Sequence, residues 1–125
     1  MKIFVHRLIV CILLATFMQT TLAQTLAWTS GCHTILSVAD YRDVESSVYL
    51  GISPGLPGCT YSGVNRVRFH LGANGVTADG MKGALAIGMV AYTTQKQVKL
   101  YYDTSSAPFC NTNLIAIGGG DNTCN

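Results

Sequence analysis

The chain has 125 residues, 49% of them hydrophobic, and a formal net charge of +2 at neutral pH. A chain of this length forms one domain and not two. Two of the 8 Lys and Arg lie before residue 24, and the 6 that remain balance the 6 Asp and Glu. The rest of the chain is therefore near neutral, which argues against a nucleic-acid partner, because such a partner needs a clustered positive surface.

The first 23 residues have the layout of a secretory signal. Lys2 and Arg7 precede an apolar segment over residues 8–17, and Ala23, a small residue suited to cleavage, precedes Gln24. The apolar segment is shorter than the roughly 20 residues that a membrane helix needs. We therefore predict a signal peptide over residues 1–23, a single mature domain over residues 24–125, and no membrane span after signal removal. The predicted location is secreted or periplasmic.

Cysteine usage agrees with export. Cys11 belongs to the predicted signal, which leaves an even number in the mature chain: Cys32, Cys59, Cys110 and Cys124. An even number in a small exported domain predicts two disulfides. The alternative is a metal site, but the chain has no Cys-x-x-Cys pair, and its histidines lie in no ligand-like cluster. We expect no metal and no cofactor.

The first half of the predicted fold consists of two strands and a long loop. Trp28–Gly31 is the segment that leads into the first strand. Cys32–Ala39 has the β-branched and apolar content of that strand. A polar turn over residues 40–43 leads to a second strand, Ser47–Ile52, with alternate apolar residues. The segment 53–59 has two prolines and two glycines, which break both helices and strands.

The segment Arg66–Leu71 alternates most strictly and predicts a half-buried third strand. Its outward residues are Arg66, Arg68 and His70, and its inward residues are Val67, Phe69 and Leu71.

A helix follows, capped by Thr77 or Asp79 and running to about Thr94. One face has the spacing of a core-facing stripe, formed by Met81, Ala84, Leu85, Gly88, Met89 and Tyr92. We expect Leu85 and Met89 to pack on the strands. Gln97–Asp103 and Asn113–Ile117 are the predicted fourth and fifth strands.

Three strands, one helix and two further strands predict a small α+β domain that is mostly β. The five-stranded Greek-key barrel called the OB-fold has this order, commonly with its helix between the third and fourth strands. Because periodicity does not give strand order, an open five-stranded sheet with one helix is the alternative. Of the three pairings that four cysteines permit, we predict Cys59–Cys110, which joins the loops after the second and fourth strands, and Cys32–Cys124, which ties the ends of the domain.

The second face of the predicted helix is apolar as well, and it consists of Gly83, Ala86, Ile87, Val90 and Ala91. A domain of about 100 residues has too little protein to cover a helix on both sides. One interpretation is an oligomer interface at Gly83, Ala86, Ile87 and Val90, in which other copies of the chain cover this face. The other is that Ala and Gly expose little apolar area and the face stays in solvent.

The segment 91–103, AYTTQKQVKLYYD after an alanine-rich helix, resembles the helix-to-strand segment of the subtilase cytotoxin B subunit and its relatives among pertussis-like toxins. Trp28-Thr29 and Ser30-Gly31 resemble the same proteins. A broader set of small exported bacterial proteins is similar too. The resemblance implies an OB-fold, a five-membered ring with helices lining its centre, outer faces that bind host glycans, and an exported enzyme as a partner subunit.

The chain departs from these toxin subunits in several places. Residues 104–110 replace their aromatic-proline segment, and the cysteine spacing differs, since the relatives favour more local bridges. By the resemblance, Ser30 and Tyr102 fall where the toxin subunits place a sugar-binding serine and tyrosine. The alternative is an ordinary strand-entry serine and a half-buried strand tyrosine.

Catalysis is not indicated. The chain has no G-x-S-x-G, no H-E-x-x-H and no free cysteine beside a histidine. His33, expected on an outer strand face, and His70 lack a paired acid or nucleophile. We therefore expect a small secreted binding protein that is not an enzyme, in the form of a glycan-binding homo-oligomer like the toxin B subunits. The alternative is a monomeric periplasmic domain that binds or inhibits another protein. The strand face that presents Arg66, Arg68 and His70 is expected either to meet an acidic partner or to be exposed to solvent.

Overall fold

The computed structural model describes residues 25–118 and Cys124, so the predicted signal over residues 1–23 lies outside the described part. In that part, no helix is long and apolar enough to cross a membrane. One sheet has three strands, in the order β1 (Leu26–Trp28), β6 (Val98–Asp103) and β7 (Thr112–Ile117). The other has four, in the order β2 (Thr34–Tyr41), β3 (Ser47–Ser53), β5 (Val64–His70) and β4 (Thr60–Tyr61). Neighbouring strands within each sheet are antiparallel.

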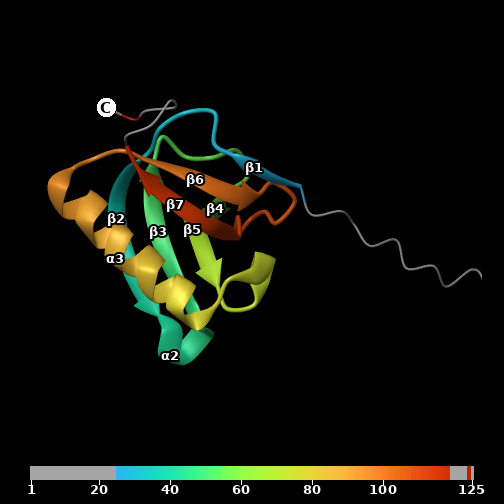
Figure 1. Cartoon of the computed structure of the whole chain (residues 1–125). Coiled ribbons are helices and arrows are strands. Elements are labelled where there is room, and N and C mark those ends of the chain that lie inside the picture. The colour runs from blue at the N-terminus through green and yellow to red at the C-terminus, as the bar shows by residue number, and fades with distance from the viewer. Residues whose placement is uncertain (1–24, 119–123, 125) are drawn as a thin grey trace, which may run out of the picture.

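Single bridges connect the two sheets. His33, just before β2, pairs with Val98 of β6, and their two backbone hydrogen bonds measure 2.9 and 2.8 Å. Arg68 of β5 forms a parallel bridge with Asn111, just before β7. Figure 1 shows β6 and β7 running across the upper part of the four-stranded sheet, with β1 beside β6. The described strands thus form two linked sheets and not one closed barrel.

The predicted class, α+β and mostly β, is confirmed. The five predicted strands correspond to β2, β3, β5, β6 and β7. Two further strands, β1 and β4, have 3 and 2 residues, too short for a periodic pattern to show. The predicted polar turn is partly a short helix, α2 (Arg42–Glu45), and a 3-10 turn, η1 (Ala73–Gly75), precedes the long helix.

The long helix α3 (Ala78–Thr94) begins as predicted, because the Thr77 hydroxyl accepts a hydrogen bond of 3.0 Å from the Gly80 amide. It lies against β2, β3 and β7 (Figure 1). Its buried residues are Met81, Ala84, Gly88 and Ala91, whereas Leu85 is only partly buried.

The predicted orientation of α3 is therefore wrong in part. Met89 and Tyr92 were expected to face the core but are 45% and 42% exposed, whereas Ala91, expected outside, is 1% exposed. The reason is a close approach at Gly88, where an added Cβ would lie 2.8 Å from Leu50 Cδ2. The small residues Ala84, Gly88 and Ala91 let the helix approach the sheet closely. The side of α3 on which they lie is therefore the side that faces the core.

The core lies between the two sheets and α3. Its fully buried members include Ile35, Val48, Leu50, Ile52, Val67, Phe69, Val98 and Leu100. Two sequence expectations are corrected here. Leu71 is 44% exposed because β5 ends at His70. His33 is 3% exposed rather than on an outer face, because its Nδ1 donates to the Pro54 carbonyl at 2.6 Å.

Both predicted disulfides are present. Cys32–Cys124 connects the segment before β2 to the C-terminal region, and Cys59–Cys110 connects the residue before β4 to the loop between β6 and β7. The second bridge lies beside a cluster of aromatic rings that includes Tyr61 and Phe109.

Candidate functional site

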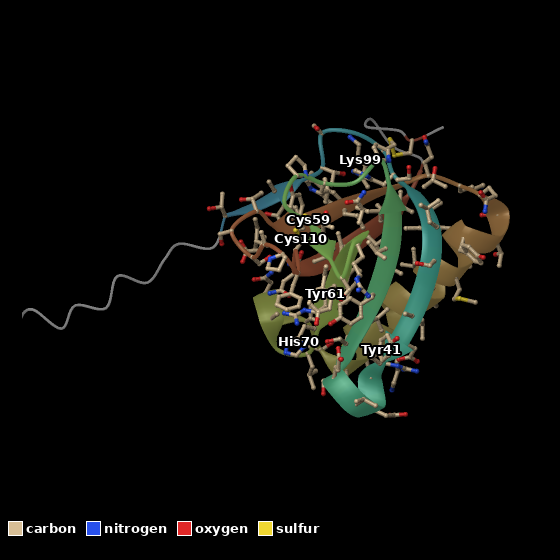
Figure 2. The ribbon with its side chains drawn as sticks, turned by 180° about the vertical axis from the view of Figure 1, so that it is seen from behind. Tyr41, Cys59, Tyr61, His70, Lys99 and Cys110 are labelled. Carbon is tan, nitrogen blue, oxygen red and sulfur yellow. A yellow bond between two sulfur atoms is a disulfide. The ribbon has the colours of Figure 1, made fainter. Side chains whose placement is uncertain are left out.

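Four rings and two arginines gather on the side of the four-stranded sheet that faces away from α3. We call this surface the aromatic–arginine face, and its members are Tyr41, Tyr49, Tyr61, Arg66, Arg68 and Phe109. Figure 2 looks onto it and shows Tyr61 below Cys59 and Cys110, with His70 further down and Tyr41 beside α2.

Strand register explains how residues far apart in the sequence meet here. Tyr49 of β3 is the partner of Arg68 in β5, and Gly51 is the partner of Arg66. Because side chains alternate along a strand, Tyr49 points opposite to the buried Val48 and Leu50, toward the side of both arginines. The glycine at position 51 permits the close approach of β2, because an added Cβ would overlap the Ser37 hydroxyl.

A disulfide brings the other two rings together. Tyr61 lies two residues after Cys59, Phe109 lies one residue before Cys110, and these cysteines are bonded. The centroids of the Tyr61 and Phe109 rings are 4.8 Å apart at an interplanar angle of 45°. The bridge therefore ties both rings to one end of β5.

The rings form a continuous row. Tyr41 meets Tyr49 edge to face with centroids 5.8 Å apart, and Tyr49 and Tyr61 are nearly parallel at 6.5 Å. Tyr41 is 45% and Tyr61 is 38% exposed, while Tyr49 is only 5% exposed. Tyr41 and Tyr61, which lie on either side of Tyr49, are thus open to solvent, and the buried Tyr49 supports them.

The arginines are held between the rings. The Arg66 guanidinium carbon lies 4.8 Å from the Tyr61 centroid and 5.2 Å from the Tyr49 centroid. Its Nε and Nη2 donate to the Tyr61 carbonyl at 3.1 and 2.8 Å. Arg68 lies 4.1 Å from the Phe109 centroid, and its Nε donates to Asn111 Oδ1 at 2.9 Å. Both guanidinium groups are oriented by neutral partners.

One acid borders this face. The Tyr49 hydroxyl donates to Glu45 Oε2 at 2.9 Å. Burial raises the pKa of Tyr49, and the hydrogen bond to Glu45 adds to the rise, whereas the nearby Arg68 opposes it. Tyr49 is therefore a neutral phenol at physiological pH, anchored to α2.

A serine and a histidine lie close together beside the face, but they do not form a nucleophilic pair. Ser47 Oγ is 2.8 Å from His70 Nδ1 and also donates to the Glu45 carbonyl at 3.0 Å. A hydroxyl has one proton to give, so it accepts from His70 Nδ1. Ser47 is fully buried, and a substrate could not reach it. We therefore assign this pair a structural role.

The residues predicted from the resemblance lie in the other sheet. Tyr102 is half-buried and packs against the core, opposite Ala27 of β1. Its neighbour Tyr101 points the other way and meets Trp28, with ring centroids 5.3 Å apart. Ser30 is exposed beyond the end of β1. The structure thus does not gather Ser30 and Tyr102 around one exposed ring, and a sugar site there stays a prediction.

The helix residues predicted as an oligomer interface are mostly at the surface. Gly83, Ala86 and Val90 are exposed, whereas Ile87 is partly buried. Met89 and Tyr92 extend the exposed apolar surface of α3, although the sequence placed them in the core. Among the described residues, no group of three or more His, Cys, Asp and Glu could hold a metal ion.

Sequence reasoning found the outward side of β5 but missed the rings beside it. Two signals could have found them. Tyr49 alternates with the apolar residues of β3, and the predicted Cys59–Cys110 bridge implies that Tyr61 and Phe109 are neighbours.

Comparison with protein-family models, with curated proteins and with solved structures gives no match to this chain.

Proposed function

We propose that this chain is an exported binding protein without catalytic activity, and that it binds carbohydrate on the aromatic–arginine face. The observation that carries the proposal is the row of rings from Tyr41 to Phe109, with two oriented arginines beside it. Sugars pack their C–H faces on aromatic rings, and their hydroxyls accept hydrogen bonds from planar N–H donors. The two disulfides support an oxidising, non-cytosolic location.

The strand connections favour an OB-like arrangement. Together with the sheet pairings, the two bridges give the neighbour order β2-β3-β5-β7-β6 and back to β2, and α3 follows the third strand of this series. The OB-fold is a partly open five-stranded barrel that binds oligosaccharides or oligonucleotides on its second and third strands and on two of its loops. Here these strands are β3 and β5, and one loop contains Phe109. Fold analogy adds weight but is not itself a functional argument.

For oligomerisation, we propose that the exposed side of α3 packs against other copies of the chain. Val90 and Met89 are 51% and 45% exposed, and Gly83 has no atom near its missing Cβ, so another helix could approach closely there. A homo-oligomer would present several sugar sites at once and raise avidity. The resemblance to toxin B subunits suggests a pentamer that delivers an exported enzyme. The alternative is a monomer that uses this side of α3 to bind or inhibit another protein.

The direct test is a panel of immobilised oligosaccharides probed with the wild type and with Tyr61→Ala. Tyr61 is exposed and contributes a ring at the centre of the row, so its loss is expected to weaken binding at least about tenfold, as for a stacking aromatic. Leu114→Ala is the control, because Leu114 is 51% exposed but belongs to β7, outside both the aromatic–arginine face and the proposed α3 interface. Equal loss in both variants, or no loss in either, would place the sugar elsewhere.

A further inference from the structure

We infer that the carbohydrate bound by the aromatic–arginine face is anionic, and specifically a polysaccharide segment with negative groups on successive sugars, such as a sulfated or uronic-acid chain. This inference rests on the proposed function and names its ligand class. The evidence is the state of Arg66 and Arg68: both are fixed in place, yet neither charge is neutralised by the described part of the protein.

The first step is charge. The ion pairs between described residues are Arg42–Asp40 and Lys82–Asp79, and neither includes Arg66 or Arg68. Arg66 and Arg68 therefore have no carboxylate partner within residues 25–118. Glu45, which borders this face, accepts a hydrogen bond from the Tyr49 hydroxyl. A guanidinium held against rings and carbonyls keeps its full attraction for an incoming anion, because no internal ion pair must first be broken.

The second step is the number of donors that remain. A guanidinium has five N–H donors in a planar fork. Arg66 uses Nε and Nη2 on a single acceptor, the Tyr61 carbonyl. Arg68 donates from its Nε to Asn111 Oδ1 and also interacts with the Tyr49 hydroxyl. Each group retains N–H donors that the described residues do not satisfy, in the fork geometry that carboxylate and sulfate groups accept. Because the rings hold both groups in place, less side-chain entropy is lost on binding.

The third step is spacing. Arg66 and Arg68 are two residues apart on β5, so they lie on the same side of the strand at a separation of roughly 6.6 Å between their Cα atoms. Two guanidinium groups in line along a strand fit a ligand with several negative groups in line better than one with a single terminal acid. The exposed rings of Tyr41 and Tyr61 flank this pair and suit the sugar faces between those groups.

Two other polyanions fit less well. A nucleic acid would need a broader positive surface, but the chain beyond the predicted signal has equal numbers of basic and acidic residues. An acidic peptide that binds a sheet commonly adds to an open strand edge, whereas these arginines project from the face of β5, which has β3 and β4 on its two sides. Both classes are nevertheless included in the test.

The experiment is calorimetric titration of the full mature chain with a heparin hexasaccharide and with a neutral chitin hexasaccharide. The inference predicts at least tenfold tighter binding of the charged sugar, and a log–log dependence of affinity on salt with a slope of about −2 for two arginines. Arg66→Gln and Arg68→Gln are each expected to weaken the charged ligand about tenfold, because each removes charge-assisted hydrogen bonds. Lys96→Gln removes the same charge at an exposed site after α3 and is expected to change nothing.

Arg68→Lys keeps the charge and serves as a second variant in case the glutamine variants fold poorly. It is expected to retain more affinity than Arg68→Gln, and a thermal melt of each variant checks the fold. Equal binding of both hexasaccharides, with no effect of the arginine variants, would overturn the anionic class but leave carbohydrate binding intact. Equal or tighter binding of oligothymidylate or hexaglutamate would overturn the glycan class. If the protein bound neither these probes nor any sugar in the panel, the proposed function itself would be contradicted.

Discussion

Arg66 contacts Tyr61 both through the aromatic ring and through the backbone carbonyl. Its guanidinium carbon lies 4.8 Å from the centre of the Tyr61 ring, and two of its nitrogens donate to the backbone carbonyl of the same residue. Strand β4, which contains Tyr61, has only 2 residues, so its own ladder contributes little to its position. Arg66 and the Cys59–Cys110 disulfide therefore hold this part of the face together.

Replacing Arg66 with alanine is expected to destabilise the domain by about 1–2 kcal/mol, through loss of the ring contacts and of hydrogen bonds to Tyr61. Lys96→Ala, at an exposed site, is expected to change the free energy of unfolding by no more than about 0.5 kcal/mol. Chemical denaturation with intact disulfides measures both. Equal stability of the two variants would mean that Arg66 is a solvated side chain.

The orientation of α3 is tested by a pair of methionines. Met81 is 3% exposed and Met89 is 45% exposed. Met81→Ala is expected to cost about 2–5 kcal/mol, because it leaves a cavity between helix and sheet. Met89→Ala is expected to cost less than about 1 kcal/mol. If Met89→Ala proved as damaging as Met81→Ala, both methionines would face the core, as the sequence pattern indicated.

Much of the fold could be predicted from the sequence, and the reasons for failure are local. The alternation of Arg66–Leu71 gave a strand whose inner residues Val67 and Phe69 are buried, and the cap at Thr77 gave the start of α3. The facing of α3 was predicted only in part, since Met81, Ala84 and Gly88 face the core as expected but Met89 and Tyr92 do not. Almost every position of the helix is apolar, so the pattern does not single out the face that makes the close approach at Gly88. Nor could the ring cluster be derived from any one segment, since it depends on register and on a disulfide.

Tyr49 supplies a prediction about alkaline pH. Burial raises its pKa above the value of 10.0 for a free tyrosine, so the unfolded chain loses this proton first as the pH rises. The stabilisation from the neutral phenol is complete below about pH 10 and is lost as the pH passes through the raised value. Tyr49→Phe is therefore expected to show a shallower loss of stability above pH 10 than the wild type in alkaline denaturation. Tyr92→Phe, at an exposed tyrosine, is the control, and identical behaviour of both variants would show that Tyr49 titrates normally.

If copies of the chain assemble through α3, a charge introduced into that interface is expected to separate them. Val90 is 51% exposed and lies on the apolar side of the helix, so Val90→Glu is expected to convert an oligomer to a folded monomer. Val44→Glu alters a residue that is 84% exposed in α2 and is expected to leave the mass unchanged. Light scattering during size-exclusion chromatography gives the mass of each variant. A wild type that is monomeric at tens of micromolar would contradict the assembly and favour the protein-binding alternative.

The central claim is that the aromatic–arginine face binds carbohydrate, and ligand-induced shifts of backbone amide NMR signals test it most directly. Titration with the charged hexasaccharide is expected to move the signals of Tyr61, Arg66, Arg68 and the loop around Phe109, while those of α3 stay in place. Shifts confined to the β1–β6 end, around Ser30 and Tyr102, would contradict this account and restore the site suggested by the toxin resemblance.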